Sequence, residues 1–152
     1  MKHDQQRADN RNSPNQPFYS SIDLNNVSSD LFSDIPERIA KRLATNTSSN
    51  KPTQLRNFFN EIVMWEERSK EKSEKQFKSE ILPFLRMMKA KAAYAHGRNN
   101  KNNDPRKGLV DRDFLNLINH CLDQVKDKKT LTHFKLFMES FMGFYKLARP
   151  KD

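Results

Sequence analysis

Positively charged side chains are concentrated between residues 86 and 112, and their chemistry is that of polyanion binding. This stretch holds eight lysines and arginines against two aspartates, a net charge of +6 out of the +9 carried by the 152-residue chain. Each phosphate that a lysine or arginine neutralises releases a condensed counterion, so such a surface attracts nucleic acid without reading its sequence. A solvated helix face followed by a polar loop has a similar composition. The clustering favours nucleic acid as the partner, and single-stranded or guide-paired RNA in particular.

Seven cations are the candidate RNA-binding residues, five of them in this basic stretch and two further upstream: Lys89, Lys91, Arg98, Arg106 and Lys107, with Lys51 and Arg56. Four alanines between residues 90 and 95 keep the predicted helix slender, so that another backbone can approach it closely. Most phenylalanines fall on predicted core stripes, and Tyr94 is the aromatic side chain most clearly available to bases. Binding is therefore expected through the RNA backbone and shape rather than through base edges.

Catalysis and metal binding find little support in the sequence. His96 beside Arg98 suggests a ribonuclease acid or base, but such chemistry usually needs a second positioned titrating group, and none is identifiable. His120 and His133 have no cysteine or paired acidic ligand at metal-binding spacing. Cys121 lies on an apolar stripe, where a cysteine usually acts as a small hydrophobe. We therefore expect no catalytic residue, no metal and no cofactor.

Length and composition predict one helical domain. A chain of 152 residues fits a single domain with a tail. Three glycines are too few for a meander of short strands, and the apolar residues recur at helical spacing, so the expected fold is an all-α bundle of about five helices. No apolar run has the length of a membrane span, and the amino terminus does not resemble a signal peptide. The expected location is the cytoplasm.

The chain divides into a polar arm at residues 1–30 and a helical RNA-binding domain at residues 31–152. The arm has too few apolar residues to offset the entropy of ordering, so it is expected to be flexible. Four residues are exceptions: Phe18, Tyr19, Ile22 and Leu24 could dock on a neighbour, although a loosely packed tail is the commoner outcome.

Capping residues and apolar stripes predict the helices. Asp34 as N-cap opens a helix that ends near Ala44, residues 45–52 form a linker, and Thr53 caps the next helix. Apolar stripes predict a third helix over residues 77–92 and a fourth over residues 110–125. A last helix is expected to begin near Thr130 or Thr132. Pro83 either kinks the third helix or opens a new one, and Gly97 is expected just beyond its end.

Two of these helices carry apolar residues on a second face. Met87, Ala90 and Tyr94 lie opposite the main stripe of the third helix, and Leu136, Gly143 and Leu147 lie opposite that of the last one. A helix that is apolar all round is either central in its bundle or covered by another subunit. A bundle of five helices is expected to have one central helix. Because two helices are apolar all round, self-association is favoured as the way to cover the second.

Three stretches, in this order, resemble the small subunit of the type III-A CRISPR effector, the Csm complex: PTQLRNFFNEI at 52–62, LPFLRMMKAKAAYAHGR at 82–98 and HFKLFMESFMGFYKLA at 133–148. The resemblance implies a compact helical bundle, stacked in several copies as an inner filament beside the backbone and large subunits. It implies contact with guide RNA and target RNA and no nuclease activity. The family's basic positions fall at Arg56, Lys89, Lys91 and Arg98, whereas Lys51, Arg106 and Lys107 are added from charge alone.

Two departures from the family pattern stand out. His96 occupies a position where the family tends to have a small residue, and the segment before residue 45 has no counterpart in the pattern. The alternative function is a helical adaptor or regulator that binds an acidic protein or duplex DNA; an RNA-degrading enzyme comes third.

Overall fold

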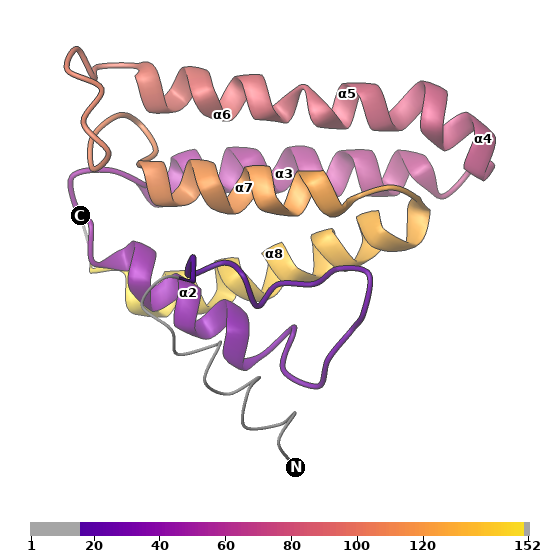
Figure 1. Cartoon of the computed structure of the whole chain (residues 1–152), viewed down its shortest axis with the longest axis horizontal. Coiled ribbons are helices and arrows are strands. Elements are labelled where there is room, and N and C mark those ends of the chain that lie inside the picture. The colour runs from indigo at the N-terminus through magenta and orange to yellow at the C-terminus, as the bar shows by residue number, and fades with distance from the viewer. Residues whose placement is uncertain (1–15, 151–152) are drawn as a thin grey trace.

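The computed structural model describes residues 16–150, and within them it contains helices and no strand, as Figure 1 shows. This confirms the predicted all-α bundle. The elements in chain order are α2 Asp34–Ala44, α3 Pro52–Ser69, α4 Glu74–Gln76, the π-helical turn η1 Phe77–Ile81, α5 Leu82–Arg86, α6 Met88–Gly97, α7 Arg112–Gln124 and α8 Lys128–Ala148. In the described part of the chain, no helix is long and apolar enough to cross a membrane.

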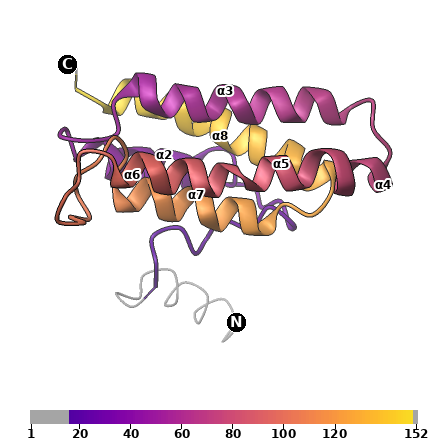
Figure 2. The same cartoon turned by 90° about the horizontal axis from the view of Figure 1, so that it is seen from above.

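Helix α8 lies at the centre of the packing. It contacts both α2 and α3, while α6 packs against α7, and the two views in Figures 1 and 2 show the long helices side by side. Its buried face carries four of the largest side chains of the core, spaced at about one helical turn: Phe134, Phe137, Phe141 and Tyr145. Burial of each such side chain contributes roughly 1.5 to 3 kcal/mol relative to exposure. The last helix is therefore central in the bundle, one of the two possibilities that its apolar pattern left open, although Leu147 on its second apolar face is exposed.

The N-caps of α2 and α3 lie one and two residues before the predicted ones. Asp34 is the first residue of α2 rather than its cap, because Ser33 takes the N-cap position and makes no side-chain cap bond. Helix α3 begins at Pro52, with Lys51 as N-cap, so Thr53 lies within the first turn and does not cap the helix. Proline favours this early start because its missing N–H would lack a helical partner there in any case.

Pro83 opens a new helix. The preceding residues, Phe77–Ile81, form a π-helical turn, and α5 then begins at Leu82 with the proline in its first turn. A proline inside a continuous helix would remove one backbone hydrogen bond and press its ring against the carbonyl four residues earlier. The wider turn keeps the side chains of Phe77 and Ile81 buried while the helix restarts.

Part of the predicted flexible arm is packed into the core. Ile22 and Leu24 are buried, and side chains from α7 and α8 bind their backbone. Gln124 Oε1 accepts a hydrogen bond from the Leu24 N–H (2.6 Å), and His133 Nδ1 donates to the Leu24 carbonyl (2.7 Å). The expectation of a loosely packed tail is therefore wrong for this segment, because its backbone is bound by the helices; residues 1–15 lie outside the described residues.

His120 completes this attachment. Its Nε2 and the amide nitrogen of Gln124 lie 2.9 and 2.8 Å from the Ile22 carbonyl oxygen. The ring also contacts that of Tyr19, with centroids 4.8 Å apart. The two histidines considered as metal ligands from sequence thus hold the segment before α2.

Candidate nucleic-acid interface

Two segments that are distant in sequence meet at one end of the bundle. The linker before α3 pairs with the loop after α6 through the Asn50 N–H and the Leu109 carbonyl (3.0 Å). The Asn46 amide donates to the Arg106 carbonyl (2.8 Å), and the Ser49 hydroxyl donates to the Gly108 carbonyl (2.6 Å). Figure 1 shows the loop crossing this end beside the start of α3. We call this surface the basic end; it carries Lys51, Arg98, Lys101, Arg106 and Lys107.

Arg149 fixes the linker to the carboxyl end of α8. Its side chain is buried, and its guanidinium donates to the carbonyls of Thr47 (3.1 Å), Ser49 (2.7 Å) and Asn50 (2.9 Å). A buried cation is costly unless it is hydrogen-bonded, and carbonyl oxygens supply that here. The Tyr145 hydroxyl, itself bonded to Asn50, accepts a further bond from the same guanidinium (2.8 Å).

Asparagines give the loop of the basic end its shape. The Asn100 amide donates to the carbonyls of His96 (3.2 Å) and Asp104 (2.8 Å), and its oxygen accepts from the Asp104 N–H (2.7 Å). Asn99 and Asn103 have positive φ angles of 59° and 52°. Asparagine tolerates this left-handed region better than most residues. The asparagine-rich composition thus builds a specific turn, around a hollow of about 380 Å³ lined by Asn99, Asn100, Lys101, Asn102, Asp104 and Lys107.

His96 is a structural residue of this loop. Its ring is buried; Nδ1 lies 2.9 Å from the Val110 carbonyl and Nε2 lies 3.3 Å from Nε of Arg112. Because an arginine can only donate, Nε2 accepts that bond and Nδ1 donates to the carbonyl. Both ring nitrogens are therefore used within the fold, which leaves the suggested ribonuclease role without support.

Lys89 and Lys91 point to opposite sides of α6. Lys89 pairs with Asp123 of α7, and Nζ of Lys91 lies 2.8 Å from Glu61 of α3. Residues two apart on a helix differ by about 200° in direction, which accounts for the two different partners. Both candidate lysines of α6 therefore have a carboxylate partner within the fold, although exposed ion pairs of this kind contribute only about 0–1 kcal/mol and a phosphate can replace the carboxylate.

The remaining candidate cations differ from these two in having no carboxylate partner. The side chains of Lys51, Arg56, Arg98, Arg106 and Lys107 are exposed, and no acidic group in residues 16–150 lies within ion-pair distance of them. Lys101 shares this property and was not among the sequence candidates, although it lies in the same basic run. The fold therefore brings together Lys51, Arg98, Arg106 and Lys107.

Arg56 lies apart from the loop, one turn into α3. It borders an open groove of about 480 Å³ between α3 and the last turns of α8. The apolar part of the groove is formed by Pro52, Phe59, Met142 and Gly143. Arg56 thus connects the basic end to an apolar surface.

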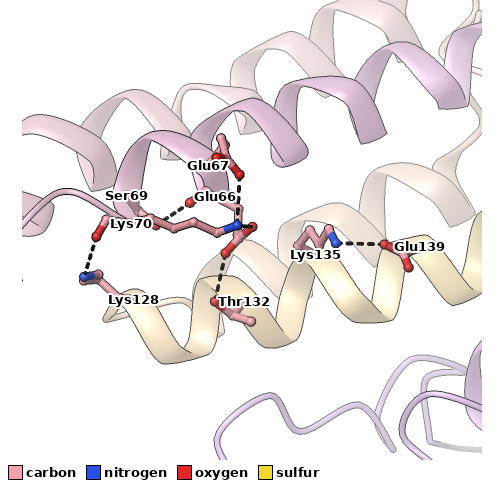
Figure 3. A network of polar contacts seen from close by, with 8 residues as sticks. All are labelled: Glu66, Glu67, Ser69, Lys70, Lys128, Thr132, Lys135 and Glu139. Carbon is pink, nitrogen blue, oxygen red and sulfur yellow. Dashed lines mark hydrogen bonds and ion pairs between the residues drawn. The ribbon is translucent and has the colours of Figure 1, made fainter.

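The opposite end of α3 and α8 shows a different charge arrangement, drawn in Figure 3. There Nζ of Lys70 lies 2.9 Å from Glu67 and 3.9 Å from Glu66, and in the middle of α8 Lys135 pairs with Glu139 at 2.8 Å. The hydrogen bond that Lys70 donates to Glu67 raises the pKa of Lys70. Lys70 and Lys135 are therefore paired with carboxylates, whereas the cations of the basic end have no such partner in the described residues.

The described residues contain no cluster of histidine, cysteine and acidic side chains that could hold a metal ion. Cys121 is fully buried on α7, and this burial raises the pKa of its thiol. A buried thiol with a raised pKa is a poor nucleophile, because the thiolate is the reactive form.

Comparison with known proteins gave one match. A family model described as Csm2 Type III-A matches residues 27–151. Neither the curated proteins nor the solved structures contain a match to this chain.

Proposed function

The chain belongs to the Csm2 type III-A family, and from this premise we propose that this small subunit of the type III-A CRISPR complex binds the phosphates of guide and target RNA through its basic end. The family is one of non-catalytic structural subunits, and we propose that this chain is likewise non-catalytic. Other subunits of the complex then cleave the RNA. The protein then works in the cytoplasm, beside the backbone and large subunits of the same complex.

The observation that carries this proposal is the group of exposed, unpaired cations at the basic end. Arg98, Lys101, Arg106 and Lys107 come from one loop, and Lys51 comes from a linker some fifty residues earlier that is hydrogen-bonded to it. A phosphate chain can approach these groups without first displacing a carboxylate, in contrast to Lys89 and Lys91. These two and Arg56 extend the contact surface on either side.

The test uses the full-length chain and labelled single-stranded RNA of two unrelated sequences. The double variant R106E/K107E should weaken binding at least tenfold at low salt, and by the same factor for both sequences. If each side chain contacts one phosphate, the slope of log affinity against log salt should become less steep by about 1.4. Fluorescence anisotropy across a salt series measures both quantities.

The matched control is K75E/K78E, which makes the same charge change at two exposed positions near the opposite end. It should alter RNA affinity less than twofold. Equal losses in the two variants would mean that net charge alone governs binding. Unchanged affinity in both would reject the basic end as the RNA surface.

The same assay separates the other candidate functions. A basic surface also attracts duplex DNA or an acidic protein. Tighter binding of duplex DNA than of RNA at equal salt would support the adaptor function instead. RNA that is shortened during incubation with the purified chain would revive the enzymatic one.

We include stacking of several copies in the proposal, because apolar surface remains uncovered. Leu147 is 86 % exposed on the outer face of α8, close in sequence to Gly143 in the groove. A Cβ added at Gly143 would meet nothing within 4 Å, so a glutamate there should not disturb the fold. G143E should therefore abolish concentration-dependent association in sedimentation velocity; wild-type protein that stays monomeric at all concentrations would count against stacking.

A further inference from the structure

Tyr94 has the most exposed aromatic side chain in the described structure, and the phosphate contacts proposed above give it no role. Its relative exposure is 70 %, and its side chain makes no hydrogen bond or ring contact within residues 16–150. The next most exposed aromatic, Phe84, is stacked on Trp65 with ring centroids 6.0 Å apart. The phenol ring of Tyr94 is therefore free to meet a ligand.

Small residues lie next to this ring on the surface of α6, together with Lys91 and Arg98. Ala90 and Gly97 lie one turn before and one turn after it, Ala93 is adjacent, and all three are exposed. Residues three and four positions apart are neighbours on a helix surface. At Gly97 the space beyond the backbone is open, since an added Cβ would meet no atom within 4 Å. A flat group can thus lie against the ring without a steric clash.

Positive charge adjoins the ring on the side of the basic end. Helix α6 ends at Gly97, Arg98 follows as its C-cap residue, and Lys101 lies three positions further on in the loop. Both side chains are exposed and have no acidic partner in the described chain. An exposed aromatic ring beside unpaired cations is the combination with which proteins hold single-stranded nucleic acid, because every base has a π face and every nucleotide has a phosphate.

We propose that Tyr94 stacks on an unpaired base of the bound RNA strand, next to a phosphate held by Arg98. The inference rests on the proposed function and adds a contact to the bases. Stacking of this kind tolerates any base, so it is compatible with binding that does not depend on sequence. It also gives single-stranded RNA an advantage over a duplex, in which the bases are already stacked on one another.

The experiment compares Tyr94→Ala and Tyr94→Phe in the full-length chain. Two labelled ligands are used: a single-stranded RNA, and an oligomer of the same length with abasic spacers that keeps the phosphates. Tyr94→Ala should weaken RNA binding about 5- to 150-fold, and Tyr94→Phe should bind nearly as the wild type does. The salt slope should be the same in all three proteins, since no phosphate contact is lost. The abasic oligomer should bind all three alike.

Failure of this inference can be told from failure of the proposed function. If the wild type binds RNA and Tyr94→Ala binds it equally well, the stacking contact is wrong while phosphate binding stands. If Tyr94→Ala keeps RNA affinity but loses self-association, the ring is a contact between copies and the inference is overturned. If the wild type binds no RNA, the proposed function falls first. Alanine is the best helix former, so the variant should fold, and circular dichroism checks this.

Discussion

Gly108 shows at the level of single residues how the loop of the basic end is built. Its φ angle is 96°, in a region that residues with a Cβ rarely adopt, and a Cβ added there would lie 2.2 Å from the His96 carbonyl oxygen. In the sequence this glycine lies between the third and fourth apolar stripes, and nothing in that pattern explains why a glycine is needed there. The close crossing of loop and helix supplies that reason.

Replacement of Gly108 by alanine should lower the free energy of unfolding by at least about 2 kcal/mol, because backbone strain adds to the clash with His96. Gly143→Ala is the matched control: it lies within α8 with open space around it, and alanine there should raise stability by up to about 1 kcal/mol. Urea unfolding of both variants measures the difference. Equal effects would show that the loop does not need a glycine.

The candidate cations differ in their surroundings, although the sequence analysis assigned all of them the same role in RNA binding. Lys91 has a carboxylate partner 2.8 Å away on α3, whereas Arg106 and Lys107 have none in the described chain. A run of basic residues in the sequence does not reveal which of them form ion pairs, because the acidic partners lie on other helices that are distant in the sequence. The basic run predicted the region of the site but not which cations are available.

At the level of secondary structure, the start of α8 depends on one side chain. Asp127 accepts hydrogen bonds from the backbone N–H of Thr130 (2.8 Å) and from its hydroxyl (2.7 Å), and the threonine hydroxyl in turn accepts from the Asp127 N–H. This capping box makes the helix begin at Lys128 rather than at the predicted Thr130 or Thr132. The threonine is the partner of the cap and not the cap itself.

Asp127→Ala should cost about 1 kcal/mol of unfolding free energy at neutral pH. Burial tends to raise the pKa of this carboxyl, but the hydrogen bonds from Thr130 outweigh that effect and hold the pKa below its ordinary value. Because the folded pKa is the lower one, the stabilisation is full above a pH of about 4 and is lost as the pH falls further. Urea unfolding at pH 7, 5 and 3 should therefore show the variant's penalty shrinking with acid. A penalty independent of pH would mean that the carboxylate charge is not used.

At the scale of the whole molecule, the segment before α2 belongs to the folded unit. Ile22 and Leu24 are buried at 1 % and 0 % exposure, although the family model matches only from residue 27 onward. Polar side chains of α7 and α8 form hydrogen bonds with the backbone of this segment. With these bonds in place, its few apolar residues are enough to keep it packed against the helices. The core of the protein therefore extends beyond the region of family similarity.

Leu24→Ala should lower the free energy of unfolding by about 2–5 kcal/mol, as expected for a leucine deep in a core. Val27→Ala, three residues later at a side chain that is 50 % exposed, should change it by no more than about 0.5 kcal/mol. Thermal or urea unfolding of the two variants compares them directly. If both substitutions were neutral, residues 22–24 would not be part of the core.

The sequence by itself determined the helical class, the approximate helices and the region rich in positive charge. These follow from local properties: apolar spacing, few glycines and the run of lysines and arginines. The sequence also contains three motifs that resemble the Csm small subunit, and all three lie within the region that the family model matches. All of these features depend on residues that are close together in the sequence.

The tertiary structure decided which residues meet. It joined the linker at 46–51 to the loop at 98–111, bound the segment at 22–24 to α7 and α8, and gave Lys89 and Lys91 acidic partners while leaving Arg106 and Lys107 without one. Each of these facts depends on contacts between residues far apart in the chain. Such contacts form only when the helices pack, and so the sequence pattern of any one segment could not reveal them.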